Sequence, residues 1–252
     1  MHNGLIRQEL DDGILTISFN HAHYHNPFSR DLGYAAADAL NEAENNLSVK
    51  AVIITGGIGR SFSVGGDFNE VSKLKGGTEV DKWIDDVVDL YMACLKLTKV
   101  SIAAIDNYAI GIGFQLAITC DFRIGTENCT FVMPELKHGI ACTLGQYMVE
   151  KLVGRAAMLE VVYGCEEIAC EKSLEYKLLQ KVVPAENLIS EAVKTARHFI
   201  SYPQVAFRKT KSLINASYIE GLNNVVGQTK KIHRAAFTDG YAQKFMQTVI
   251  NA

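Results

Sequence analysis

The sequence lacks several features that mark particular classes of protein. It has only four prolines in 252 residues and no low-complexity tract, so we expect no long linker. No uninterrupted apolar run approaches the length of a membrane span, and the first twenty residues hold no basic segment followed by an apolar one. We therefore expect a cytoplasmic protein that does not act at a membrane.

The sequence has no strong excess of positive or of negative charge. Lysine and arginine total 25 against 28 aspartates and glutamates, and the basic residues are scattered along the chain. Because nucleic-acid binding requires clustered positive charge, we expect no nucleic-acid partner. With 48% hydrophobic residues, the chain can bury one sizeable core with an appended subdomain.

The cysteines and histidines give little sign of a metal or a disulfide framework. The six cysteines, at positions 94, 120, 129, 142, 165 and 170, form no C-x-x-C pair, and we predict buried free thiols. His21, His23 and His25 alternate along an extended segment and offer metal ligands. No second cluster of ligands lies near them in sequence, so we predict no metal site.

Apolar runs alternate with segments of helical length. We predict strands in the runs 13–20, 51–57 and 101–111, because each is short, rich in β-branched residues and closed by turn residues. Ser29 suits the N-cap of a following helix, residues 79–97 have helical periodicity, and two further extended runs are DFRIGT and CTFVMPE. From about Gly145 onward we expect an almost wholly helical end. The alternation predicts an α/β fold.

The stretch RSFSVGGDFNEV, residues 60–71, contains the first of two glycine turns. Gly65 and Gly66 have no side chains and permit positive φ, so a ligand can approach the backbone there. A tight loop chosen for its geometry alone is the alternative interpretation.

The second glycine turn is AIGIGFQ, residues 109–115, which precedes an apolar segment of helical length. A helix start presents unpaired N–H groups that suit an anion or a developing oxyanion. The third glycine of a dinucleotide fingerprint is missing, since Leu116 occupies its place, and no G-K-S/T follows.

The acid that attracts attention is Glu135 in FVMPELKHGI, residues 131–140. A glutamate after proline is typical of the first turn of a helix, where it complements the dipole. The apolar residues before it support a second interpretation, because burial would raise the pKa of the carboxyl and suit it to proton transfer.

Taken together, the two glycine turns and the Pro-Glu segment resemble the crotonase (enoyl-CoA hydratase/isomerase) superfamily in order and separation. The resemblance implies an α/β spiral of ββα units with a C-terminal helical subdomain, which binds an acyl-CoA thioester and forms a homotrimer or a dimer of trimers. We assign residues 1–190 to the spiral core and residues 191–252 to a helical trimerisation or lid region.

The resemblance also implies roles for individual residues. The backbone N–H groups of Gly66 and Ile112 would hold the thioester oxygen as it becomes an enolate. Hydratases of the family use two glutamates; here Gln115 occupies the first position and Glu135 remains as the single acid. Single-glutamate members include isomerases and enzymes that make an enolate by losing CO₂.

Longer stretches, among them HNPFSR, WIDDVVDLY and YAIGIGFQ, resemble the crotonases of carbapenem biosynthesis. These enzymes decarboxylate malonyl-CoA, add the enolate to the imine pyrroline-5-carboxylate and hydrolyse the thioester to (2S,5S)-carboxymethylproline. A single-glutamate enoyl-CoA isomerase and a non-catalytic acyl-CoA-binding homologue are the alternatives.

This closer resemblance implies further contacts to the substrates. Decarboxylation needs no base, and an amide at Gln115 would avoid repelling the substrate carboxylates and could donate a hydrogen bond to them. His233 would bind the amino-acid carboxylate; without the resemblance it would be interpreted as an exposed helix histidine. The residues expected to line the CoA tunnel are His25, Asn26, Gly65, Asp67 and Phe68, with Phe237 closing it.

Overall fold

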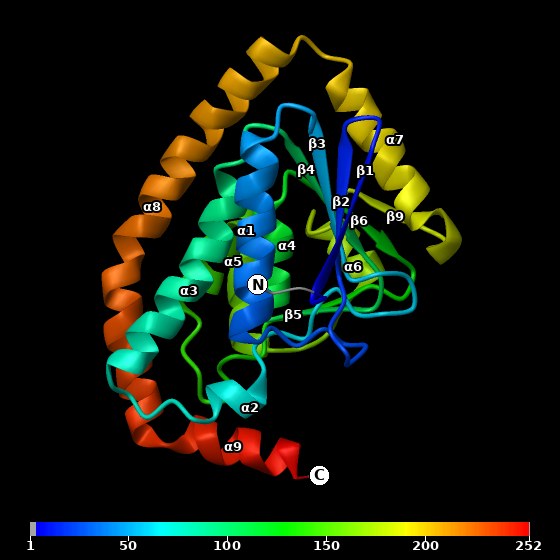
Figure 1. The fold of residues 1–252 in the computed structure, drawn as a ribbon. Helices are drawn as coiled ribbons and strands as arrows, with labels where there is room; N and C mark the ends of the chain where they lie inside the picture. Colours follow the sequence, from blue (N-terminus) through cyan, green and yellow to red (C-terminus); the bar gives the residue numbers. More distant parts are fainter. Residues whose placement is uncertain (1–3, 252) are drawn as a thin grey trace.

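A computed structural model of the protein, described here for residues 4–251, confirms the predicted alternation of strands and helices (Figure 1). Six strands form the main sheet in the order β1-β2-β3-β4-β6-β9; β1 is antiparallel to β2 and the other neighbours are parallel. These strands are β1 (Ile6–Asp11), β2 (Ile14–Phe19), β3 (Ala51–Thr55), β4 (Val100–Ile105), β6 (Phe122–Thr126) and β9 (Lys181–Val183). A second sheet contains β5 (Tyr108–Ile110), β7 (Thr130–Val132) and β8 (Ile168–Ala169).

Helices cover both faces of the main sheet (Figure 1). They are α1 (Arg30–Asn45), α2 (Phe68–Val71), α3 (Thr78–Leu95), α4 (Ile112–Thr119), α5 (Thr143–Gly164), α6 (Cys170–Glu175), α7 (Leu188–Ile200), α8 (Gln204–Asp239) and α9 (Tyr241–Ile250), with a 3₁₀ turn at Ala185–Asn187. Strands β3 and β4 are buried along their whole length, as expected for parallel strands covered on both sides. The helix predicted after Ser29 is α1, and the Ser29 side chain accepts a hydrogen bond from the N–H of Leu32.

The run 101–111 was predicted as one strand and is in fact two. The chain leaves the main sheet at Asp106 and Asn107, where Asn107 has a left-handed φ of 54°. The buried Asp106 carboxylate fixes this break, because it accepts hydrogen bonds from the Gly59 N–H at 2.7 Å and the Thr126 hydroxyl at 2.6 Å. Strand β5 then joins the second sheet, parallel to β7.

The prediction of an almost wholly helical end was also wrong in part. Strand β9 lies within that region and adds an edge strand to the main sheet beside β6. The next helix, α7, spans the expected boundary between residues 190 and 191 and buries Leu188, Ala192 and Ala196 in a core formed with the sheet. The division into a core and a C-terminal region stays a prediction.

The last two helices enclose one side of the molecule. Figure 1 shows α8 running along the outer side of α3, and α9 turning back beneath α2. Near the start of α8, the buried Lys211 ammonium donates hydrogen bonds to the Asp121 carboxylate at 2.6 Å and to the Lys99 carbonyl at 2.7 Å. This pair attaches α8 to the sheet where β4 and β6 begin, because Asp121 also accepts from the Ser101 N–H.

Two further expectations concern the cysteines and membrane-spanning segments. All six cysteines are free; five are buried as predicted, and Cys170 is partly exposed. Within residues 4–251, no helix combines the length and apolar character needed to cross a bilayer.

Candidate active site

The two glycine turns lie side by side. The Ser63 N–H donates to the Tyr108 carbonyl at 3.2 Å, and the Ile110 N–H donates to the Ser63 carbonyl at 2.8 Å, so the first turn pairs with β5. A Cβ atom on Gly113 would lie 2.6 Å from the Ser63 carbonyl oxygen. Glycine at this position therefore allows the approach, and the turns are placed together by strand pairing.

Two backbone N–H groups point to ligand binding at this junction. Gly111 adopts φ 51° and ψ −116°, a conformation that favours glycine, and α4 begins at the next residue, Ile112. Among residues 4–251, the N–H groups of Gly66 and Ile112 have no hydrogen-bond acceptor. Both residues line the same cavity, so these donors are available to a ligand oxygen.

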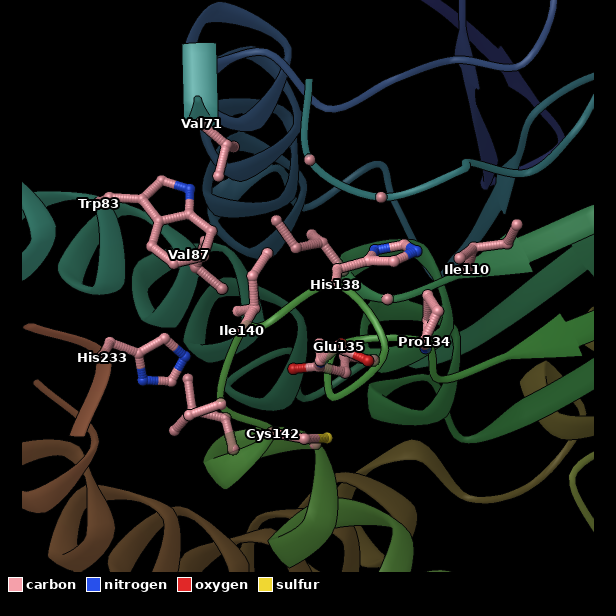
Figure 2. A pocket seen from close by; sticks show the side chains of 18 of the residues that line it. Val71, Trp83, Val87, Ile110, Pro134, Glu135, His138, Ile140, Cys142 and His233 are labelled. Carbon is pink, nitrogen blue, oxygen red and sulfur yellow. The ribbon is translucent and has the colours of Figure 1, made fainter. Parts of the chain in front are cut away.

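This main cavity has a volume of about 670 Å³ and is largely apolar. It is lined from α3 by Trp83 and Val87, from the turn after β7 by Glu135 and His138, and from α8 by His233, as Figure 2 shows. An apolar cavity with a few convergent polar groups is the usual form of a small-molecule site.

Glu135 lies in a turn and not in the first turn of a helix, so the helix-dipole interpretation is wrong. The turn is closed by the Ile140 N–H, which donates to the Glu135 carbonyl at 2.8 Å. Burial raises the pKa of Glu135 from its ordinary 4.5 to about 7, against the opposing effects of its own backbone N–H and of Gln115. Its Oε2 atom is buried and has no hydrogen-bond partner among the described residues. The carboxyl is thus suited to exchange a proton near neutral pH.

Gln115 links Glu135 to a buried tyrosine. Its Nε2 donates to Glu135 Oε1 at 2.8 Å and contacts the Met133 sulfur at 3.6 Å, while its Oε1 accepts from the Tyr91 hydroxyl at 3.0 Å. Tyr91 therefore fixes which side of the amide faces the acid. Sequence reasoning missed this role, because Tyr91 falls within the helix predicted over 79–97, and helical periodicity does not report a hydrogen bond made by a side chain.

His233 is buried, and the interpretation as an exposed helix histidine is wrong. Its Nδ1 donates to the Thr229 carbonyl at 2.9 Å, and its ring lies 5.9 Å from the Trp83 ring between centroids. Burial lowers the pKa of His233, although the Thr229 and Ala141 carbonyls act in the opposite direction. Because a carbonyl can only accept, Nδ1 carries the hydrogen. In the neutral form, Nε2 is therefore the ring nitrogen that can accept a hydrogen bond.

Some of the residues predicted to contact CoA line a cavity in the structure, and others do not. Gly65 and Phe68 line the main cavity, and Phe68 also lines a wider outer cavity together with Asp67. Phe237 is only 1% exposed and packs beneath Trp83, with ring centroids 5.7 Å apart. Its proposed closing role stays a prediction.

The segment before α1 is tied to the first glycine turn. The buried Asn26 amide donates to the carbonyls of Gly56 and Ser61, and His25 Nδ1 lies 2.7 Å from the Ser61 hydroxyl. The Asn26 side chain is thus committed to the fold, and only its backbone is left for the predicted CoA contact. His25 and Asn26 do not line the main cavity.

Across the described part of the chain, no group of three or more His, Cys, Asp or Glu side chains is arranged to hold a metal ion. In the histidine segment, the ring Nδ1 of His21 accepts a hydrogen bond from the His23 backbone N–H, and the ring Nδ1 of His23 accepts one from the His25 backbone N–H. These contacts give the alternating histidines a part in shaping their own loop.

Comparison with known proteins agrees with this architecture. Residues 9–249 match the enoyl-CoA hydratase/isomerase family. The chain is 40% identical over 246 residues, covering 98% of both chains, to a carboxymethylproline synthase of Pectobacterium carotovorum subsp. carotovorum. It is 28% identical to a crotonyl-CoA hydratase of Syntrophomonas wolfei subsp. wolfei, over 91% of this chain and 86% of the relative.

Solved structures show the same fold. The structure of ThnE from S. clavuligerus superimposes with a TM-score of 0.79 and 34% identity, covering 90% of this chain and 100% of ThnE. An enoyl-CoA hydratase/isomerase from Mycobacterium paratuberculosis gives a TM-score of 0.89 at 21% identity, covering 97% and 98% of the two chains. The predicted crotonase-like α/β fold is confirmed, and the chain belongs to the enoyl-CoA hydratase/isomerase family.

Proposed function

We propose that this protein is a carboxymethylproline synthase, which decarboxylates malonyl-CoA, joins the resulting enolate to pyrroline-5-carboxylate and hydrolyses the thioester. The similarity over nearly the whole chain to a protein of that name supports the proposal. The observation that carries it is Gln115, which stands one turn into α4 and leaves Glu135, among the described residues, as the only carboxylate lining the main cavity.

Decarboxylation uses the two free N–H groups. The bond between the malonyl carboxylate and the α-carbon breaks, CO₂ leaves, and the electron pair moves to the thioester oxygen. The Gly66 and Ile112 N–H groups would stabilise that oxyanion, and each such donor is typically worth about 10²–10³ in rate. No protein base is needed, which is consistent with an amide at position 115.

Carbon–carbon bond formation follows when the enolate carbon attacks the imine carbon, whose nitrogen becomes an amine. His233 lines the same cavity from α8, and we propose that it binds the imine substrate. Its Nε2 can accept from a protonated imine, and it can donate to a carboxylate only after the ring gains a proton. Burial lowers the pKa of His233, so the ring gains that proton only if the negative charge of an incoming carboxylate favours it.

Thioester hydrolysis requires a base. We assign this step to Glu135, whose Oε2 atom has no partner and is free to accept a proton from water. The hydroxide so formed adds to the thioester carbon, and the carbon–sulfur bond breaks to release CoA. Gln115 would hold the other carboxylate oxygen in place through its 2.8 Å hydrogen bond.

The test is an incubation of the protein with malonyl-CoA labelled at its free carboxylate and with pyrroline-5-carboxylate. We expect labelled CO₂, free CoA and carboxymethylproline, each measured separately. Glu135→Ala should retain CO₂ release and accumulate the CoA thioester of the product. Isomerisation of an enoyl-CoA with no consumption of malonyl-CoA would favour the isomerase, and binding without turnover of either thioester would favour the non-catalytic homologue.

We also propose that the chain assembles as a homotrimer or a dimer of trimers through the region 191–252. Helix α8 supports this proposal, because it exposes the large apolar side chains of Val205, Leu213 and Ile214. Light scattering coupled to size-exclusion chromatography distinguishes these states from a monomer.

A further inference from the structure

A second cavity lies beside the main one and is lined mainly by residues of α1, α2 and α3. This side cavity has a volume of about 420 Å³. It shares four lining residues with the main cavity: Val71, Trp83, Val87 and Ile112. The shared residues form an apolar partition between the two spaces.

The main cavity also borders the outer cavity. Six residues line both it and the outer cavity, among them Gly66, Phe68 and His138. An acyl-CoA whose thioester oxygen contacts the Gly66 and Ile112 N–H groups must extend its long pantetheine chain through one opening. The outer cavity is the larger, at about 1130 Å³, and suits that chain.

The proposed reaction needs both substrates at once. An enolate formed in contact with water takes a proton and is lost as acetyl-CoA, so the imine must already be present when CO₂ leaves. If the CoA chain fills the outer opening, an imine that binds second requires a different route.

The rim of the side cavity carries charges of both signs. The Arg30 Nε lies 3.0 Å from Asp86 Oδ2, and the side chain of Arg30 is 43% exposed. Lys82 also pairs with Asp86 at 3.1 Å, and the exposed Glu70 carboxylate accepts from the Arg30 backbone N–H at 2.8 Å. Such a rim suits a small molecule that carries both a carboxylate and a protonated nitrogen, and the apolar partition suits its ring.

We propose that the side cavity is the entrance through which the amino-acid-derived imine reaches the main cavity while acyl-CoA is bound. The inference rests on the proposed function, because only a two-substrate reaction requires a second route. Trp83, Val87 and Ile112 then form the inner gate, and the ion pair of Arg30 with Asp86 stands at the outer end.

Gly33 of α1 provides a means to block this entrance. It lines the side cavity but not the main cavity, and a Cβ atom there would meet no atom within 4 Å. Its backbone is helical, so a larger residue fits without backbone strain. Gly33→Leu fills the passage, Gly33→Met does so with a more flexible side chain, and Gly33→Ala is the matched control that leaves it open.

The experiment measures kcat/KM for pyrroline-5-carboxylate at saturating malonyl-CoA, and separately the release of CO₂ from malonyl-CoA without the imine. For Gly33→Leu and Gly33→Met we expect kcat/KM for the imine to fall by about tenfold or more, with more acetyl-CoA formed per product. Imine-independent CO₂ release and the KM for malonyl-CoA should match those of Gly33→Ala. Thermal unfolding of all three variants checks that each is folded.

The outcomes separate the two proposals. A folded Gly33→Leu protein whose kcat/KM for the imine stays within about twofold of the wild type overturns the entrance. An equal fall in imine-independent CO₂ release also overturns it, because the effect would not be specific to the imine. A wild-type protein that leaves malonyl-CoA unchanged refutes the proposed function, and the entrance falls with it.

Discussion

The buried carboxyl of Glu135 makes the stability of the protein depend on pH in a way that one substitution should remove. Glu135→Gln keeps the shape of the side chain and leaves an oxygen that can still accept from Gln115 Nε2. It removes the ionisable group. The change therefore tests the cost of the buried charge separately from the packing around it.

The magnitude follows from the pKa of Glu135, which burial raises from 4.5 to about 7. Between these values the folded protein binds a proton that the unfolded chain has released, so the free energy of unfolding falls as the pH rises and levels off above about 7. The difference between the two pKa values, at about 1.4 kcal/mol per pH unit, amounts to about 3 kcal/mol. The ionised carboxylate thus destabilises the wild-type fold by about that amount at pH 8.

Urea unfolding at pH 5 and pH 8 measures the effect. The free energy of unfolding of Glu135→Gln, measured relative to that of the wild type, should be about 2–3 kcal/mol higher at pH 8 than at pH 5. Glu186→Gln, which changes an exposed carboxylate, is the matched control and should show no comparable gain. Release of CoA, in contrast, should be lost in Glu135→Gln and should rise through about pH 7 in the wild type.

A stability difference between Glu135→Gln and the wild type that stays constant from pH 5 to pH 8 would refute this reasoning. It would mean that Glu135 is solvated well enough to ionise at its ordinary pKa. The carboxyl would then have no special fitness for proton transfer near neutral pH.

Three further substitutions test the surroundings of Glu135. Gln115→Glu places a second carboxylate beside it, and a like-charge repulsion of about 4 kcal/mol at about 4 Å should shift the pH profile of CoA release upward by more than about one unit. Tyr91→Phe leaves the buried Gln115 oxygen without its donor, so urea unfolding should show a loss of about 1–3 kcal/mol, and the pH profile of CoA release should also move upward because the amide is no longer held toward Glu135. Gly111→Ala strains a residue at φ 51° and displaces the Ile112 N–H, so the rate of labelled CO₂ release should fall by about 10²-fold while binding of acetyl-CoA changes less.

Much of the fold and the glycine turns could be predicted because the signals are local. The β-branched runs identified β2, β3 and β4, and the N-cap at Ser29 identified the start of α1, since both depend on neighbouring residues. The end of β4 was missed because the break depends on Asp106, whose partners Gly59 and Thr126 are distant in sequence. Strand β9 was missed because three residues are too short to show a period.

The site was predictable to the extent that it consists of the backbone. Gly66 and Ile112 were identified from the resemblance of the two glycine turns to the family, and they line one cavity. The bond between Gln115 and Glu135 could not be predicted from the same signals, since the spacing of residues says nothing of which amide hydrogen meets which carboxylate oxygen. Tyr91 was hidden for a similar reason: periodicity reports that a face is buried, and does not report that a hydroxyl on that face has a partner on another helix.

The contact between Lys211 and Asp121 has a consequence for how the site responds to distant changes. Lys211 and His233 lie on the same uninterrupted helix, 22 residues and thus about 33 Å apart along its axis. A helix of that length behaves as a stiff rod, so a small tilt where it is fastened becomes a larger displacement at the other end. The position of His233 in the main cavity is therefore set partly where β4 and β6 begin, and substitutions there can shift this histidine without altering any residue that lines the cavity.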